Sequence, residues 1–196
     1  DGKPVGVGTL DFAAPEQLLE GKSLRELSPR ERAQKIAYLP QNRQTPELTV
    51  GTLVLHGRFS RLRYPRRYGE EDRQAAQKAM EWAGIAHLKE ERLPRLSGGM
   101  QQKAYLAMAL CQDAKVLLLD EPTTFLDISQ QLRLMQTAKE LALGGKAVVL
   151  VLHDLSLALQ TADRLILMQE GKVLRQGTAE ELLADGLLQR VFGVGV

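Results

Sequence analysis

The sequence predicts an α/β protein with a mostly parallel sheet flanked by helices, and three observations support this fold class. Two short apolar runs, residues 116–119 and Ala147–Leu152, have the length and composition of strands that are buried on both faces. A segment with helical periodicity lies between them and ends at Gly144-Gly145. Polar residues follow each apolar run directly, as they do where the strands of a parallel sheet end at a ligand site.

The bulk properties exclude several classes of protein. The chain has 196 residues, with 26 Lys and Arg against 24 Asp and Glu, so its net charge of +2 gives no nucleic-acid signature, and we expect no nucleic-acid partner. The single cysteine, Cys111, cannot form an internal disulfide and is expected to be a small buried hydrophobe. No apolar run approaches the roughly 20 residues of a membrane helix, and the first residues lack signal-peptide features. We therefore expect a chain of cytosolic type.

Two carboxylates, Asp120 and Glu121, stand where the strand at residues 116–119 ends. Open α/β sheets bind ligands outside the carboxyl ends of their strands, so these groups can hold a metal ion or activate water. The alternative is a strand followed by an acidic turn without chemistry.

A candidate anion site precedes this strand. Ser97 is a good N-cap, and Gly98 and Gly99 leave backbone N–H groups uncovered at the start of a helix. Such a terminus attracts phosphate, because its donors are unsatisfied and the helix dipole is positive there. The same three residues alone would also suit a flexible loop.

Three motifs together indicate a family. LSGGMQQ (residues 96–102), VLLLDEP (116–122) and TTFLD (123–127) resemble, in order and spacing, the signature motif, Walker B motif and D-loop of an ABC transporter ATPase. YLPQ (38–41) resembles the Q-loop of that family, and LHD (152–154) resembles its H-loop. The resemblance implies a P-loop NTPase-like fold and binding of ATP and Mg²⁺. Met100 and Phe125 depart from the usual motifs, and we expect them to tune activity without abolishing it.

Under this resemblance, four residues act on the nucleotide of their own subunit. Asp120 would hold Mg²⁺, and Glu121 would be the general base for the attacking water. Gln41 would complete the surroundings of the metal and the water, and His153 would hydrogen-bond the γ-phosphate.

The resemblance also implies a site shared between two copies of the chain. Ser97, Gly98 and Gly99 would contact the γ-phosphate held by the opposite subunit, and Gln101 belongs to the same nucleotide-binding set. Asp127 would cross the dimer interface. Hydrolysis would then require a head-to-tail homodimer.

The phosphate loop GxxxxGK[ST] expected in this family is not intact. The GKS at residues 21–23 lacks the first glycine, since Glu16 stands in its place. The string GVGTL (residues 6–10) would become the end of a phosphate loop if Lys-Ser stood between Gly8 and Thr9, so we assign Gly6, Gly8 and Thr9 to nucleotide binding. We interpret the string as lacking residues after Val5, after Gly8 and after Leu10. The alternative is a truncated protein with a glycine-rich tail.

The domain organisation follows from composition. Residues 49–95 are rich in helical patterns, including a helix between Gly69 and Gly84, and predict an α-helical subdomain. Residues 1–48 and 96–196 form the predicted RecA-like ATP-binding core, with a small antiparallel region at residues 163–176. In the helix after the D-loop, the spacing of four residues predicts core packing: Ile128, Leu132, Met135 and Ala142.

A basic cluster lies within the predicted subdomain. Tyr64 is surrounded by five arginines, which are Arg58, Arg61, Arg63, Arg66 and Arg67. The cluster is either a solvated loop or a contact to a membrane partner or anionic headgroups.

Within the family, the motifs look most like importer subunits for iron–siderophore, haem or cobalamin uptake. This implies integral-membrane permease subunits as partners, a periplasmic or extracellular substrate-binding protein acting indirectly, and a peripheral position on the cytoplasmic face of the membrane. Two alternatives stay open: a soluble ABC ATPase of another process, and a non-catalytic ABC-like module if the phosphate loop is truly absent.

Overall fold

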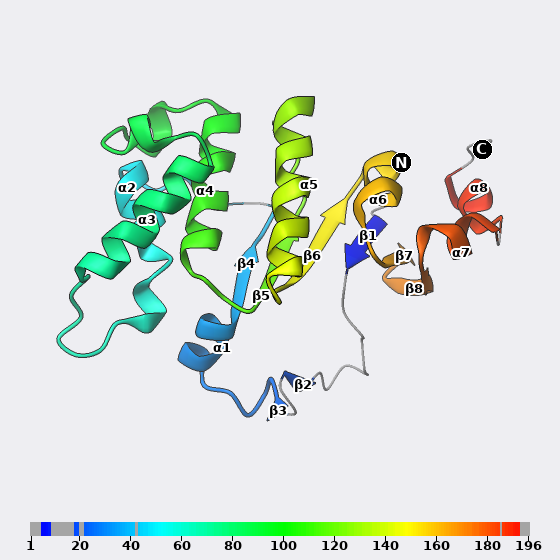
Figure 1. Ribbon diagram of the computed structural model, residues 1–196, viewed down its shortest axis with the longest axis horizontal. Coiled ribbons are helices and arrows are strands. Elements are labelled where there is room, and N and C mark those ends of the chain that lie inside the picture. Colours follow the sequence, from blue (N-terminus) through cyan, green and yellow to red (C-terminus); the bar gives the residue numbers. More distant parts are fainter. Residues whose placement is uncertain (1–4, 9–17, 20–21, 42, 185, 193–196) are drawn as a thin grey trace.

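A six-stranded sheet forms the centre of the computed structural model, which describes residues 5–8, 18–19, 22–41, 43–184 and 186–192 (Figure 1). In spatial order the strands are β4 (Ile36–Leu39), β5 (Val116–Asp120), β6 (Ala147–Leu152), β1 (Val5–Gly8), β7 (Leu165–Gln169) and β8 (Lys172–Gly177). Two short strands, β2 (Leu18–Leu19) and β3 (Lys22–Ser23), pair separately. Lys22 and Ser23 of the GKS sequence thus pair with Leu19 and Leu18, and Gly21 lies outside the described residues.

The sheet has a parallel half and an antiparallel half. β5 pairs in parallel with both β4 and β6. β1 is antiparallel to both β6 and β7, and β7 is antiparallel to β8. The predicted α/β class with a small antiparallel region is confirmed, and the antiparallel region also includes β1.

The structure has helices along the whole described chain, and several of these helices begin at side-chain caps that the sequence provides. The helices are α1 (Pro29–Lys35), α2 (Val50–His56), α3 (Glu70–Trp82), α4 (Gly98–Cys111), α5 (Ile128–Leu143), α6 (Leu155–Thr161), α7 (Ala179–Ala184) and α8 (Leu187–Phe192). Single 3₁₀ turns cover Phe59–Arg61, Ala86–Leu88 and Leu93–Arg95. Ser28 and Glu31 form a complete capping box at α1. No helix in the described ranges is long and apolar enough to cross a membrane.

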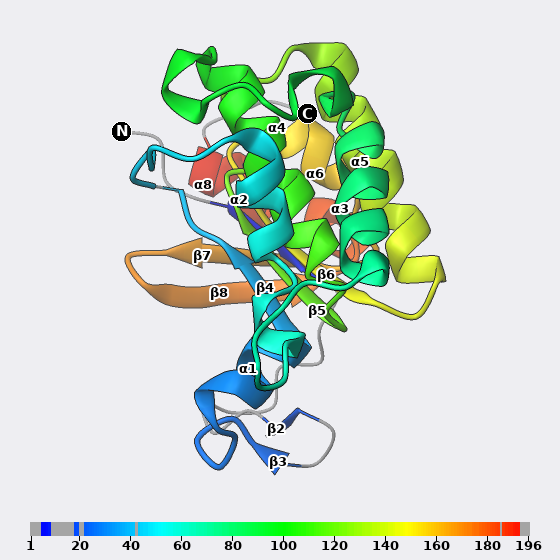
Figure 2. The ribbon, with the colours of Figure 1, turned by 90° about the vertical axis from the view of Figure 1, so that its left-hand side faces the viewer.

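One face of the sheet packs against α4 and α5, which lie on the same side of it (Figures 1 and 2). The buried residues of this face alternate along the strands and include Ala37, Leu39, Leu117, Leu119, Val148 and Leu150. On α5, the predicted core positions Ile128 and Leu132 are wrong, because their exposed fractions are 76% and 54%. Leu134 and Met135 are buried there, so the core stripe is displaced around the helix.

The opposite face of the sheet is less covered. Tyr38 of β4 is 57% exposed, and Leu118 and Val149 of the two neighbouring strands are only partly buried. Sheets with parallel strands are ordinarily covered on both faces. Within the described part of the chain, no long helix packs against this face.

The helical segment between β4 and β5 packs as a small bundle. α2, α3 and α4 contact one another, with Val54, Met80 and Leu93 fully or almost fully buried among them. α4 also contacts β4, so it joins the bundle to the sheet. The division of the chain at residues 49 and 95 stays a prediction.

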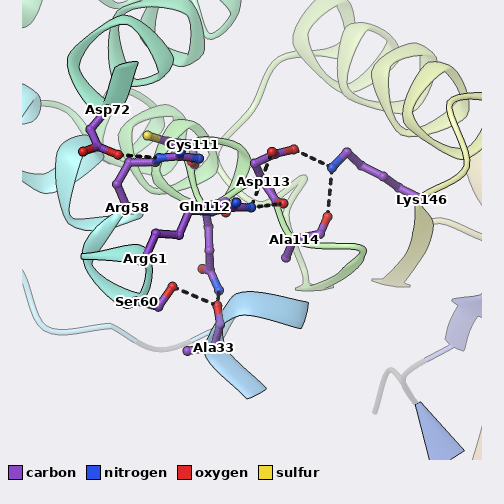
Figure 3. A network of polar contacts seen from close by, with 10 residues as sticks. All are labelled: Ala33, Arg58, Ser60, Arg61, Asp72, Cys111, Gln112, Asp113, Ala114 and Lys146. Atoms are coloured by element: carbon purple, nitrogen blue, oxygen red, sulfur yellow. Dashed lines mark hydrogen bonds and ion pairs between the residues drawn. The ribbon is translucent and has the colours of Figure 1, made fainter. Parts of the chain in front are cut away.

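A polar network fixes the bundle to the sheet at the end of α4 (Figure 3). Arg58 pairs with Asp72 at 3.0 Å and donates to the Cys111 carbonyl at 3.4 Å. Arg61 donates to the Asp113 carbonyl at 2.7 Å, and Lys146 pairs with the Asp113 carboxylate at 2.7 Å. Two arginines of the predicted basic cluster are therefore structural.

The remaining basic residues of the cluster, Arg63, Arg66 and Arg67, are exposed, as is Tyr64. Cys111 is buried as expected, and burial raises the pKa of its thiol to about 11. At neutral pH this thiol is protonated and behaves as a small apolar side chain.

Asp72 provides a test of the network. Burial raises the pKa of Asp72, but the Gly69 N–H, which donates to it at 2.9 Å, and Arg58 outweigh burial and hold that pKa below its usual value. A lowered pKa in the folded state stabilises the protein above the unfolded pKa of about 3.9, and this stabilisation is lost as the pH falls through the folded pKa.

We therefore predict that Asp72→Asn lowers the free energy of unfolding by about 2 kcal/mol at pH 7. Urea denaturation should show the difference from the unsubstituted chain shrinking as the pH falls below about 4. Asp163→Asn, at an exposed carboxylate, is the control and should change stability by less than about 0.5 kcal/mol. If Asp72→Asn lowers the free energy of unfolding by the same amount at pH 7 and below about pH 4, the prediction is contradicted.

Candidate active site

The parallel strands bring three predicted site residues to one edge of the sheet. Leu39 of β4 is the register partner of Leu119 in β5, and Asp120 is the partner of Val151 in β6. Glu121 and His153 come directly after these aligned strand ends, and Gln41 follows the end of β4 by two residues. The aligned strand ends therefore place these three positions at the same edge of the sheet.

Glu121 and His153 are in direct contact at this edge. His153 Nε2 lies 2.5 Å from Glu121 Oε1, and the Thr124 hydroxyl donates to Glu121 Oε2 at 3.4 Å. The Glu121 side chain is 13% exposed, whereas that of His153 is 51% exposed. The carboxylate is thus enclosed and oriented, while the imidazole reaches solvent. This arrangement can accept a proton from water and donate a hydrogen bond to an anion.

The backbone of Glu121 is held in an uncommon conformation. Its φ is +47°, which costs energy for a residue with a side chain, and a proline follows it. The Glu121 N–H donates to the Val151 carbonyl at 3.1 Å, which ties this turn to β6. Strained conformations of this kind persist where the surroundings fix them, and they cluster at functional sites.

Asp120 is the last residue of β5 and is partly buried. Mg²⁺ needs only one or two protein carboxylates, because water and substrate phosphates complete its six ligands. Among the described residues, no group of three or more His, Cys, Asp or Glu forms a metal cluster. The Asp120 carboxylate at the end of β5 would supply one protein ligand of this kind.

The signature segment starts α4, as predicted. Ser97 is its N-cap and accepts a hydrogen bond from the Met100 N–H at 3.4 Å, and Gly98 and Gly99 form the first turn. Phe125 lies against both glycines. A Cβ atom at Gly98 would be 3.5 Å from the Phe125 ring, and one at Gly99 would be 2.8 Å from the Phe125 carbonyl oxygen. A side chain at Gly99 would therefore displace the D-loop backbone.

Two other predicted nucleotide-binding residues hold local structure. The Gln101 amide donates to the carbonyls of Leu93 and Leu96 at 3.0 and 3.1 Å, and its oxygen accepts from the Thr45 hydroxyl at 3.3 Å. Asp127 caps α5 by accepting from the Gln130 N–H at 2.9 Å. In this structure both side chains stabilise the loops that carry the motifs.

The glycines assigned to the phosphate loop lie in a strand. Gly6 and Gly8 are part of β1, opposite Val151 and Val149 of β6. Thr9, the junctions after Gly8 and Leu10, and Glu16 lie outside the described residues. The structure brings β1 to the middle of the sheet, next to the strand that carries His153.

Sequence reasoning missed a polar cluster beneath this edge. Arg43, two residues after Gln41, lies over the Tyr105 ring at 4.6 Å and donates to Gln102 Oε1. Burial lowers the pKa of Arg43 and raises that of Tyr105. The available signal was a glutamine, Gln102, next to an otherwise apolar stretch of α4.

The comparisons with known proteins decide the family. The family model described as ABC transporter matches residues 8–124, more than half of the chain. The chain belongs to the ABC transporter family.

The chain is 40% identical over 178 residues to the ferric enterobactin transport ATP-binding protein of Escherichia coli. It is 42% identical over 184 residues to a hemin import ATP-binding protein of Gloeobacter violaceus. Each match covers 90% of this chain and 66% of the relative, so the chain spans just under two thirds of their length.

Solved ABC structures agree with the fold. A transporter of metal-chelate type in an inward-facing conformation matches with a TM-score of 0.71 and 26% identity, over 82% of this chain and 64% of that one. A dimeric bacterial ABC transporter cassette matches with a TM-score of 0.71 and 27% identity, over 82% of this chain and 72% of that one. The sheet and its helices are therefore those of an ABC cassette.

Substitutions of Asp127 test whether its cap hydrogen bond or its negative charge stabilises the start of α5. Asp127→Ala should lower the free energy of unfolding by about 1 kcal/mol, because the Gln130 N–H loses its acceptor. Asp127→Asn retains an oxygen acceptor and should unfold within about 0.5 kcal/mol of the unsubstituted chain. Thermal and urea denaturation measure both. Equal losses in the two variants would show that the negative charge, and not the cap, stabilises this turn.

Proposed function

We propose that this chain is the ATP-hydrolysing subunit of an ABC importer, which binds and hydrolyses MgATP to drive uptake of an iron–siderophore, haem or cobalamin-like compound. Relatives named for ferric enterobactin transport and hemin import support the substrate class. The observation that carries hydrolysis is the contact between Glu121 and His153 at the carboxyl edge of the sheet.

The residues at this edge divide the chemistry of phosphoryl transfer. Glu121 takes a proton from the attacking water, and His153 hydrogen-bonds the γ-phosphate. Asp120 and Gln41 would hold Mg²⁺, which supplies neutralising charge to the phosphates when it is bound. Because the Glu121 carboxylate is enclosed and oriented by His153 and Thr124, little reorganisation is needed when water is deprotonated.

A second copy of the chain would complete the site. The first turn of α4 presents the Gly98 and Gly99 backbones, which suit a γ-phosphate held by a partner subunit. The similarity to a dimeric cassette supports this arrangement. Permease subunits would hold the dimer at the cytoplasmic face of the membrane, and a periplasmic or extracellular substrate-binding protein would deliver the cargo to them.

The less covered face of the sheet has room for a helix that would follow a phosphate loop. Tyr38, Leu118 and Val149 would offer that helix an apolar surface.

One observation favours the second candidate, a non-catalytic module. Gly6 and Gly8 lie in a strand that pairs on both sides, so their backbones are not arranged as a loop around phosphates.

Substitution of the general base tests the first candidate. We predict that Glu121→Gln reduces ATP turnover by at least about 100-fold, because the amide cannot accept the proton from water. Binding of ATP should persist, since the amide has the same shape as the carboxylate. The measurement is phosphate release under single-turnover and steady-state conditions. Glu90→Gln, at an exposed glutamate, is the matched control and should retain full turnover. Undiminished turnover in Glu121→Gln would overturn the assignment of the base.

A further inference from the structure

A single buried glutamine connects three parts of the active site. Gln102 is 2% exposed, and among the described residues it is the only polar or charged side chain that is buried. Its Nε2 donates to the Pro122 carbonyl at 2.9 Å, and its Oε1 accepts from Arg43. Burying an amide without partners is costly, so a glutamine at this position is retained only if both contacts persist.

The contact to Pro122 lies next to the strained turn. Glu121, with φ at +47°, is held on its amino side by the hydrogen bond of its own N–H to the Val151 carbonyl. On its carboxyl side the next carbonyl, that of Pro122, accepts from Gln102. Pro122 is itself fully buried. The left-handed backbone of Glu121 is thus fixed between β6 and α4, and this fixes the direction of its side chain toward His153.

Arg43 carries the connection to the turn after β4. Its guanidinium lies on the Tyr105 ring, and the Tyr105 hydroxyl donates to the Gln44 carbonyl at 2.7 Å. One guanidinium nitrogen of Arg43 is buried and has no hydrogen-bond partner in the described part of the chain. Gln102 Oε1 accepts from the other terminal nitrogen of this partly buried guanidinium, so the two side chains depend on each other.

We propose that Gln102 and Arg43 are positioning residues, which hold the Glu121 backbone in its left-handed conformation and connect it to the turn that carries Gln41. Neither side chain touches the reacting atoms. The first part of this proposal concerns the backbone alone, and the effect on turnover rests on the proposed function. Movement of the Gln41 turn or of the start of α4 would reach the general base through these two residues.

Gln112, the C-cap residue of the same helix, offers a matched control. Its Nε2 donates to the carbonyl of Ala33 in α1 at 2.5 Å (Figure 3) and to that of Ile36, the first residue of β4, at 2.8 Å. Gln102→Leu and Gln112→Leu each remove a glutamine amide that donates to backbone carbonyls. Both should lower stability, but only Gln102→Leu should disturb the Glu121 turn.

Native-state hydrogen exchange tests the backbone part and needs no nucleotide. In Gln102→Leu, the amides of Glu121, Thr124 and Leu126 should exchange at least about tenfold faster than in the unsubstituted chain, since one of the ties holding the turn is lost. In Gln112→Leu these amides should exchange as they do in the unsubstituted chain. Unchanged exchange in a folded Gln102→Leu variant, or equal acceleration in both variants, would overturn the proposal.

ATP kinetics test the consequence for catalysis. Gln102→Leu should lower kcat about tenfold or more with KM for ATP nearly unchanged, whereas Gln112→Leu should retain kcat. Arg43→Lys should lower kcat less, because lysine keeps the charge but not the planar contact with Tyr105. The double variant Arg43→Lys/Gln102→Leu should have the kcat of Gln102→Leu alone, since Arg43 acts through Gln102. Additive losses, or a kcat unchanged by Gln102→Leu, would contradict this chain of contacts.

The two measurements separate failure of the proposal from failure of the proposed function. If the unsubstituted chain shows no ATP turnover, the hydrolytic function fails, while hydrogen exchange still decides whether Gln102 holds the turn. If turnover is normal and the Glu121 amides are insensitive to Gln102→Leu, the positioning role fails and hydrolysis stands.

Discussion

The parallel pairing of β4, β5 and β6 is the constraint on which the rest of the structure depends. Because Leu39 aligns with Leu119 and Asp120 aligns with Val151, the residues after each strand end meet at one edge. Gln41, Glu121 and His153 are far apart in sequence, and the alignment of the strands is sufficient to place them at the same edge. A shift of the register by one residue would also turn the buried side chains of a strand toward the opposite face of the sheet, so the core and the site are fixed by the same hydrogen bonds.

Helix α4 connects the edge of the sheet that carries these residues to the helical bundle. Its first turn carries the signature glycines, its middle places Gln102 beneath the Pro122 carbonyl, and its last turn enters the polar network of Arg58, Asp72 and Asp113. It packs against α2, α3 and β4 as well. Movement of the helical bundle relative to the sheet would therefore displace both the signature turn and the Pro122 carbonyl next to Glu121, because α4 contacts both.

Much of this fold follows from local sequence, and the exceptions have physical reasons. Residues 116–119 and Ala147–Leu152 are predictable because apolar strands of their length have few alternatives, and the cap at Ser97 marks a helix start. Ile128 and Leu132 show the limit, since helical spacing identifies a stripe but not the direction it faces. The Phe125 contact with Gly98 and the pairing of Gln102 with Arg43 depend on loops far apart in sequence, and no local pattern encodes them.

The role of the carboxyl edge as a nucleotide site is tested most directly by equilibrium binding of MgATP to the 196-residue chain, measured by titration calorimetry. Assignment of Asp120, Gln41 and His153 to the metal and the phosphates predicts saturable binding that requires Mg²⁺ and is abolished by EDTA. Absence of saturable binding at about 1 mM MgATP, the upper end of ordinary enzyme affinities, would contradict it and favour a non-catalytic module.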